Sequence, residues 1–321
     1  MPNRRAAILG GLSAAAMITV SRPAFAAGKL NIIATTGMIA DAARQVGGDL
    51  VEVRGLMGAG VDPHGYRQTH SDIVAMTRAD LVLWHGLYLE AQMEGFFEDL
   101  ARKRVVIPVA EALPKDNLLG HADYDGRYDP HVWMDPSLWR GVVTEVARTL
   151  SDIAPDHAAM FTANAERYNA ELEALAVYAA EALGKVVSEQ RVLLTAHDAF
   201  SYFGRAYGFE VIGIQGISTN SEAGLNRIGE LVDTLVTRKI TAAFVETSVS
   251  DRNIRALIEG AMAQGHQVAI GGALFSDAMG QEGTYEGTYV GMIDHNVTTI
   301  ASALGANVDP GGMSGKLSVG S

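Results

Sequence analysis

Neither glycine nor proline interrupts the chain between Asp156 and Leu183, a stretch rich in alanine, glutamate and leucine. Because these residues are strong helix formers and helix breakers are missing, we predict one continuous helix over residues 155–186. Such a helix is about 45 Å long at 1.5 Å per residue. A chain of 321 residues usually forms more than one domain, so we expect this helix to be a stiff connector between two lobes that limits hinge motion.

Both flanks of this helix alternate between short apolar runs and amphipathic stretches. The apolar, β-prone runs are 30–35, 50–57, 81–86 and 105–110 before it, and 191–196, 209–217, 242–248 and 267–275 after it. The helical stretches are 37–46, a segment from about Ser71, 90–103, a segment after Pro136, 222–238, 251–264 and a last helix after Tyr285. This alternation is typical of βα units around a parallel sheet. We therefore predict an α/β fold: two βα lobes with parallel sheets, at 27–154 and 187–305, joined by one long rigid helix. We expect the tail 306–321 to be disordered.

The first 26 residues have the three parts of an export signal. Arg4 and Arg5 give a basic start, an apolar stretch follows to Val20, and residues 24–26 (Ala-Phe-Ala) match a signal-peptidase site. The apolar stretch is shorter than the roughly 20 residues that span a bilayer. We expect a cleaved signal and a periplasmic mature protein, and the arginine pair raises the twin-arginine route as an option. Loss of three arginines and no acid changes the formal charge from −12 to −15.

Charge and cysteine content narrow the possible partners. The chain has 37 acidic and 25 basic residues, which disfavours nucleic acid and favours cations. It has no cysteine, so disulfides, thiolate nucleophiles, thiolate metal sites and a lipid-carrying cysteine are all excluded. Any metal ion must therefore be held by nitrogen and oxygen donors.

Four potential metal donors follow predicted strands. His64 and His131 lie in two copies of Asp-Pro-His in the first lobe, and proline stiffens each turn. In the second lobe, His197 ends the strand 191–196 and Asp277 follows the strand 267–275. Ligands of open α/β sheets bind beyond the carboxyl ends of the strands, so we expect these four side chains to converge. Three imidazoles and one carboxylate favour Zn²⁺, since Mn²⁺ prefers more oxygen.

The remaining histidines and nearby acids are open to simpler explanations. We assign five histidines to structure or solvent: His70, His85, His157, His266 and His295. His121, in a polar loop, is either a weak secondary metal contact or a solvated residue. Three carboxylates could orient the imidazoles or could be ordinary polar residues at strand ends: Asp135, Asp198 and Glu246.

Several motifs resemble the cluster A-I periplasmic metal-binding proteins, the zinc- and manganese-capturing subunits of ABC importers. They are DPHGY (62–66), DPHVWMDP (129–136), TAHDAFSYFGRAYGF (195–209), GISTNSEAG (216–224), FVETSVSDRNI (244–254), LFSD (274–277) and EGTYVGMIDHN (286–296). The resemblance covers essentially the whole mature chain. It implies two α/β lobes on one long helix, a metal ion as transported ligand in the interlobe cleft, and delivery to a membrane permease. By motif, the family's ligands fall on the same four residues: His64, His131, His197 and Asp277. We expect the protein to be a monomer and not an enzyme.

Two departures from the family pattern bear on the metal. Zinc-dedicated members often carry a His-rich loop, whereas residues 113–129 contain only His121. Manganese-dedicated members usually have Glu at the position of His197, and the pattern here resembles members that take both metals. We favour Zn²⁺, with Mn²⁺ a close second. The alternative from another class is a metal-dependent phosphohydrolase of the HD type, suggested by His197-Asp198, but those enzymes are all-α.

Overall fold

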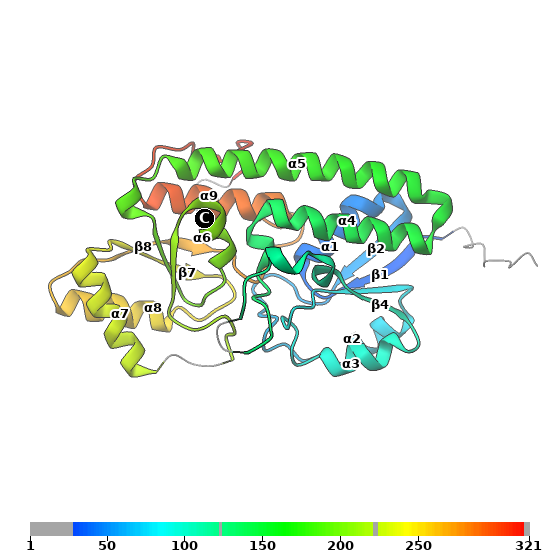
Figure 1. The fold of residues 1–321 in the computed structure, drawn as a ribbon, viewed down its shortest axis with the longest axis horizontal. Coiled ribbons are helices and arrows are strands. Elements are labelled where there is room, and N and C mark those ends of the chain that lie inside the picture. The colour runs from blue at the N-terminus through cyan, green and yellow to red at the C-terminus, as the bar shows by residue number, and fades with distance from the viewer. Residues whose placement is uncertain (1–27, 122–123, 221–223, 318–321) are drawn as a thin grey trace, which may run out of the picture.

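The computed structural model describes residues 28–121, 124–220 and 224–317. The predicted export signal, with its arginine pair, and residues 318–321 lie outside this part of the chain. Parallel strands and helices alternate on both sides of a long helix (Figure 1), which confirms the predicted fold class. No helix within the described residues is both long and apolar enough to cross a membrane.

The N-terminal half contains one parallel sheet of four strands in the order β2-β1-β3-β4. The strands are β1 (Leu30–Ala34), β2 (Val51–Gly55), β3 (Leu81–Trp84) and β4 (Val105–Pro108). Helices α1 (Gly37–Gly47) and α4 (Pro136–Ile153) cover one face, and α2 (His70–Arg78) and α3 (Glu94–Ala101) cover the other. Neighbouring side chains of β1 lie on opposite faces of the sheet: Ile32 packs toward α1, and Ile33 packs toward α2 and α3. Burial of both faces explains the continuous apolar run of β3, whose four residues are all buried.

The C-terminal half holds two parallel strand pairs, β5-β6 and β7-β8, and β5 lies beside β7. The strands are β5 (Val192–Thr195), β6 (Glu210–Gly213), β7 (Ala242–Glu246) and β8 (Ala269–Leu274). The helices are α6 (Ser201–Tyr207), α7 (Leu225–Arg238), α8 (Arg252–Ala263) and α9 (Tyr289–Ala303). Short 3-10 helices are Gly48–Leu50, Val109–Ala112, Lys115–Asn117, Val132–Met134, Pro155–His157 and Ser188–Gln190.

The long helix α5 (Ala158–Gly184, 27 residues) follows a 3-10 turn at Pro155–His157 and runs along both halves (Figure 1). It is supported along its length, because α4 and α1 pack against one part and α9 against the other. Its Tyr168 hydroxyl donates to buried Asp41 of α1 at 2.6 Å, and its Tyr178 hydroxyl lies 3.0 Å from Thr298 of α9. The connector is therefore also part of the packed interior.

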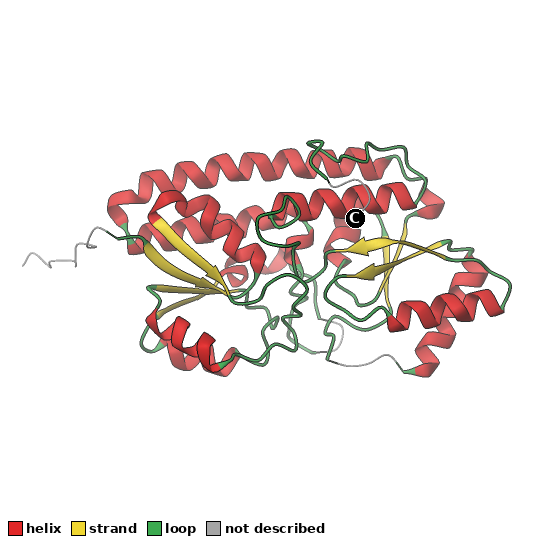
Figure 2. Cartoon of the chain, turned by 180° about the vertical axis from the view of Figure 1, so that it is seen from behind, coloured by secondary structure: helices red, strands yellow, loops and turns green. Residues whose placement is uncertain are grey.

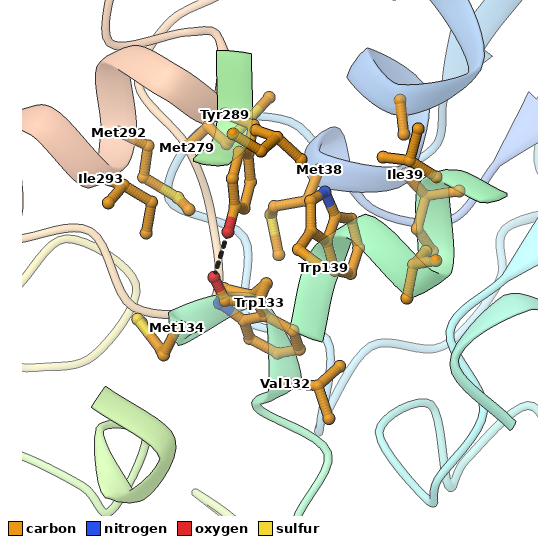
Figure 3. Close-up of a cluster of buried hydrophobic side chains, with 14 of the residues drawn as sticks. Met38, Ile39, Val132, Trp133, Met134, Trp139, Met279, Tyr289, Met292 and Ile293 are labelled. Carbon is orange, nitrogen blue, oxygen red and sulfur yellow. Dashed lines mark hydrogen bonds between the residues drawn. The ribbon is translucent and has the colours of Figure 1, made fainter. Parts of the chain in front are cut away.

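One hydrophobic core extends through both halves beneath α5. It includes Met38 of α1, Trp139 of α4 and Tyr289 of α9, which gather in a single cluster (Figure 3). Trp139 stacks on Tyr289 with ring centroids 5.5 Å apart. Two smaller clusters fill the outer faces of the sheets, under α2 and α3 and under α7 and α8. The two halves thus share their largest core.

The described part of the C-terminal tail differs from the expectation of disorder. The Met313 backbone N–H donates to the buried carboxylate of Asp294 in α9, at 2.9 Å from Oδ1. Leu317 is only 8% exposed. A buried acceptor on α9 and an apolar anchor explain why residues 306–317 follow a defined path.

Candidate metal centre

The structure brings the four predicted donors together. His64, His131, His197 and Asp277 each offer a donor atom, and these atoms lie within 4.8 Å of one another. Nε2 of His131 is 3.3 Å from Nε2 of His64 and 3.3 Å from Oδ1 of Asp277. Nε2 of His197 is 3.2 Å from Oδ2 of Asp277. Donors about 2.0–2.1 Å from one ion at tetrahedral angles would be about 3.3–3.4 Å apart, so the cluster has the size of a tetrahedral metal site.

Strand direction explains the convergence. In Figure 2 the arrowheads of the strands in both halves point toward the middle of the molecule. His64 follows β2, His197 directly follows β5 and Asp277 follows β8, while His131 starts the 3-10 helix that leads into α4. All four side chains are buried, and the most exposed, His64, is only 3% exposed. The carboxyl ends of strands from two halves therefore enclose one site.

The two Asp-Pro-His segments form the same local turn. The carboxylate of Asp62 accepts the backbone N–H of His64 at 2.8 Å, and that of Asp129 accepts the N–H of His131 at 2.9 Å. An aspartate that bonds the backbone two residues later is an Asx turn, and the intervening proline fixes the chain direction. Both histidines are thereby presented from a stiff backbone.

Beyond this turn the two copies differ. Oδ1 of Asp129 also lies 2.7 Å from Nδ1 of His131 and so holds the imidazole ring. The second oxygen of Asp62 instead accepts the hydroxyl of Thr219, in the other half, at 2.5 Å. Asp129 therefore orients a donor ring, whereas Asp62 ties the His64 loop to the C-terminal half.

Glu246, at the end of β7, orients the third imidazole. Its carboxylate accepts the backbone N–H of His197 at 2.9 Å and lies 2.5 Å from Nδ1 of the same residue. A neutral imidazole that donates its Nδ1–H to a carboxylate presents the Nε2 lone pair on the opposite side, which is the form a metal ion binds once the Nε2 proton has left. His131 and His197 are both held in this way.

The converging atoms lack other partners. Nε2 of His197 and both carboxylate oxygens of Asp277 are buried and make no hydrogen bond within the described part of the chain. Buried polar atoms without partners are costly in a folded protein. A divalent cation at the centre would satisfy all of them at once.

The three histidines of the cluster have different pKa values, because neighbouring carboxylates outweigh burial at two of them. Burial lowers the pKa of His64 to about 3. Burial also disfavours the charged form of His131, yet Asp129 and Asp277 raise its pKa to about 9. For His197, Asp277 and Glu246 overcome burial and raise the pKa well above 6.5. These two imidazolium ions hold the pKa of Asp277 well below its usual range despite its burial.

Two cavities reach the cluster from different sides. One of about 280 Å³ is lined by His64, His121, Tyr124 and Asn220 among others. A second, of about 90 Å³, is lined by Asp277 together with Thr36 and Gly37 at the start of α1. His121, the ambiguous loop histidine, thus lies on the same cavity as His64 but outside the group of four donors.

Three histidines outside the group of four donors bond backbone carbonyls. Nε2 of His85 lies 2.7 Å from the carbonyl oxygen of Pro130. Nε2 of His266 lies 2.6 Å from that of Ile240, and Nε2 of His295 lies 2.9 Å from that of Ala273. These contacts agree with a structural assignment.

Sequence reasoning identified one of the two carboxylates that orient a donor ring and missed the other. Of the three candidates, Glu246 contacts a donor ring, while Asp198 accepts from Ser201 and Asp135 caps α4 through the Ser137 N–H. Asp129 was missed. The repeated Asp-Pro-His could have indicated the two Asx turns, but the contact with the ring depends on the folded loop.

Comparison with known proteins agrees with this geometry. The family described as zinc-uptake complex component A periplasmic (ZnuA) matches residues 32–303. The chain is 46% identical to the manganese-binding lipoprotein MntA of Bacillus subtilis (strain 168) over 276 residues, 86% of this chain and 90% of that protein. It is 45% identical to the zinc-binding protein TroA of Treponema pallidum (strain Nichols) over 284 residues, 88% of this chain and 92% of that protein.

A solved structure shows the same arrangement of elements. The periplasmic zinc-binding protein TroA of Treponema pallidum superposes with a TM-score of 0.84, covering 86% of this chain and 99% of the other. Since the family match spans nearly all the described residues, the resemblance inferred from the motifs is confirmed. The chain belongs to the ZnuA family of periplasmic metal-binding proteins, the substrate-binding components of metal ABC importers.

Proposed function

We propose that this protein captures one divalent transition-metal ion as cargo and delivers it to the permease of an ABC importer. The ion would be bound by His64, His131, His197 and Asp277. The observation that carries the proposal is that the four buried donor atoms lie within 4.8 Å of one another, with three of their separations at 3.2–3.3 Å. Several of these atoms have no other partner in the described structure. That spacing suits a single tetrahedral ion.

Zn²⁺ is the favoured cargo and Mn²⁺ a close second. The two relatives named above are almost equally similar to this chain, and one is named for manganese and the other for zinc. The choice therefore rests on the donors. Three imidazoles and one carboxylate suit Zn²⁺, whereas Mn²⁺ prefers more oxygen ligands.

The arrangement supports binding rather than catalysis. Four protein donors complete a tetrahedral sphere, while a catalytic zinc keeps one position for water or substrate. The phosphohydrolase alternative also requires an all-α fold, whereas this chain has eight strands in parallel sheets among its described residues. We propose that the protein is not an enzyme.

The setting follows from the family and the sequence. We propose a monomer that works in the periplasm after removal of residues 1–26, with lobes at 27–154 and 187–305 joined by the helix 155–186. The acidic surface charge would attract cations, and no binding to nucleic acid is expected.

The test is a titration of the metal-free mature chain with Zn²⁺ and with Mn²⁺, followed by calorimetry and by competition with a chelator. We expect about one ion per chain and a higher melting temperature with metal. His131→Ala should remove most of the affinity, because three donors cannot complete the sphere. His157→Ala, at an exposed position at the start of α5, is the matched control and should bind normally.

Two results would overturn the proposal. One is equal binding by the wild type and the His131→Ala variant. The other is turnover of a phosphodiester that His197→Ala abolishes. Elemental analysis of protein purified from its own periplasm would decide between zinc and manganese.

A further inference from the structure

Trp133 joins the two halves of the molecule beside the metal centre. It follows the donor His131 by two residues and is fully buried. Its indole N–H donates to the carbonyl of Ser276, at 2.8 Å, and Ser276 immediately precedes the donor Asp277. Its own carbonyl accepts the Tyr289 hydroxyl at 2.7 Å (Figure 3). One residue of the N-terminal half thus makes two hydrogen bonds to the C-terminal half.

The partners of Trp133 are themselves held firmly. Asn296 of α9 bonds both backbone groups of Phe275: its Oδ1 accepts the N–H at 2.9 Å, and its Nδ2 donates to the carbonyl at 2.7 Å. Tyr289 is the first residue of α9. The loop that carries Asp277 is therefore fixed to α9, and both are fixed to Trp133.

The indole ring also packs against the donor on its own side. The ring centroids of Trp133 and His131 are 5.1 Å apart at an interplanar angle of 63°. Asp129 holds the opposite side of this imidazole through Nδ1. The bond between Trp133 and Ser276 therefore restrains movement of His131 relative to Asp277.

We propose that Trp133 is a positioning residue that sets the distance between His131 and Asp277 before the metal ion arrives. The inference rests on the proposed function, since it concerns the same four donors. Two donors from different halves form a preassembled pair, and the ion does not have to pull them together. Preorganisation of this kind strengthens binding because less order is lost when the ligand binds. It acts mainly on the rate at which the ion leaves.

Trp139 provides a matched control. It is also a fully buried tryptophan, it lies in the same cluster as Trp133, and its Nε1 has no hydrogen-bond partner within the described residues. Trp133→Phe and Trp139→Phe therefore remove the same atoms from the same core. Only the first removes a bond between the halves. Tyr289→Phe is the second test, because it deletes a single hydroxyl that bonds the Trp133 carbonyl.

The experiment measures Zn²⁺ affinity, Zn²⁺ release to a chelator, and the visible absorption of the Co²⁺-loaded protein. For Trp133→Phe we expect a loss of affinity of about tenfold to a hundredfold, the range found when outer partners of metal ligands are removed. The Co²⁺ bands, which report ligand geometry, should change as well. The affinity of Trp139→Phe should stay within about threefold of the wild-type value. For scale, a tenfold change in affinity corresponds to about 1.4 kcal/mol. Tyr289→Phe should also lose Zn²⁺ affinity, but less than Trp133→Phe does.

The outcomes separate the two proposals. Equal affinity, release rate and Co²⁺ spectrum for Trp133→Phe and Trp139→Phe would overturn the positioning role while leaving the metal site intact. If Trp133→Phe does not fold, a Tyr289→Phe variant indistinguishable from the wild type would overturn it instead. Absence of metal binding by the wild type would refute the proposed function itself.

Discussion

Replacing Asp129 tests how strongly a carboxylate outside the donor set supports the metal centre. Oδ1 of Asp129 holds both the ring Nδ1 and the backbone N–H of His131, at 2.7 and 2.9 Å, and the side chain is 1% exposed. In Asp129→Asn the amide oxygen can still accept both bonds, so only the charge is lost. Asp129→Ala removes the bonds as well. Since such outer partners contribute about tenfold to a hundredfold in affinity, we expect about tenfold for Asn and about a hundredfold for Ala, or about 1.4 and 2.7 kcal/mol.

Competition with a chromophoric chelator measures these dissociation constants directly. Asp135→Asn is the control: it makes the same chemical change in the same motif, but Asp135 caps α4 through the Ser137 N–H and contacts no donor. Asparagine is also a good cap, so stability and affinity should both persist. Equal affinities for the wild type and both Asp129 variants would refute the argument that this carboxylate orients His131.

Three further predictions concern protons, metal choice and stability. The pKa of His131 is raised to about 9 and that of His197 well above 6.5, so both hold a displaceable proton near neutral pH. Metal binding should release about two protons, and affinity should rise as the pH rises above neutral, as calorimetry in buffers of different ionisation enthalpy would show; absence of proton release would contradict this. His197→Glu adds an oxygen donor and should shift competition titrations toward Mn²⁺; unchanged relative affinities would count against that reasoning. Tyr168→Phe removes the hydroxyl that donates to buried Asp41 at 2.6 Å. The free energy of unfolding of the metal-free protein, measured with urea, should fall by about 1–3 kcal/mol, while metal affinity stays unchanged. An unaltered unfolding midpoint would argue against this role of the bond.

The convergence of the four proposed donors could be predicted from the sequence, because position along a strand is local information. His197 and Asp277 each follow an apolar run, and parallel strands bring their carboxyl ends to one edge of a sheet. The long helix could be predicted in the same way, since the absence of glycine and proline is a local property of the sequence. These features needed no knowledge of which segments meet across the molecule.

What the sequence did not reveal depends on tertiary contacts. Asp62 and Asp129 stand in identical Asp-Pro-His segments, yet one bonds Thr219 and the other the ring of His131. The bond from Trp133 to Ser276 joins residues 143 positions apart, and no periodicity points to it. The shared core beneath α5 was likewise missed, because the helix was predicted as a connector between separate bodies.

That shared core makes the folding of each half depend on the other. Met38 of the first half and Tyr289 of the second are buried in the same cluster, under a helix that spans both. A cut within α5 would expose apolar surface on either fragment, so neither half is equipped to fold when produced alone. Exchange of one half for that of a relative would also have to preserve the packing of this shared cluster. We therefore expect the two halves to unfold in one cooperative transition.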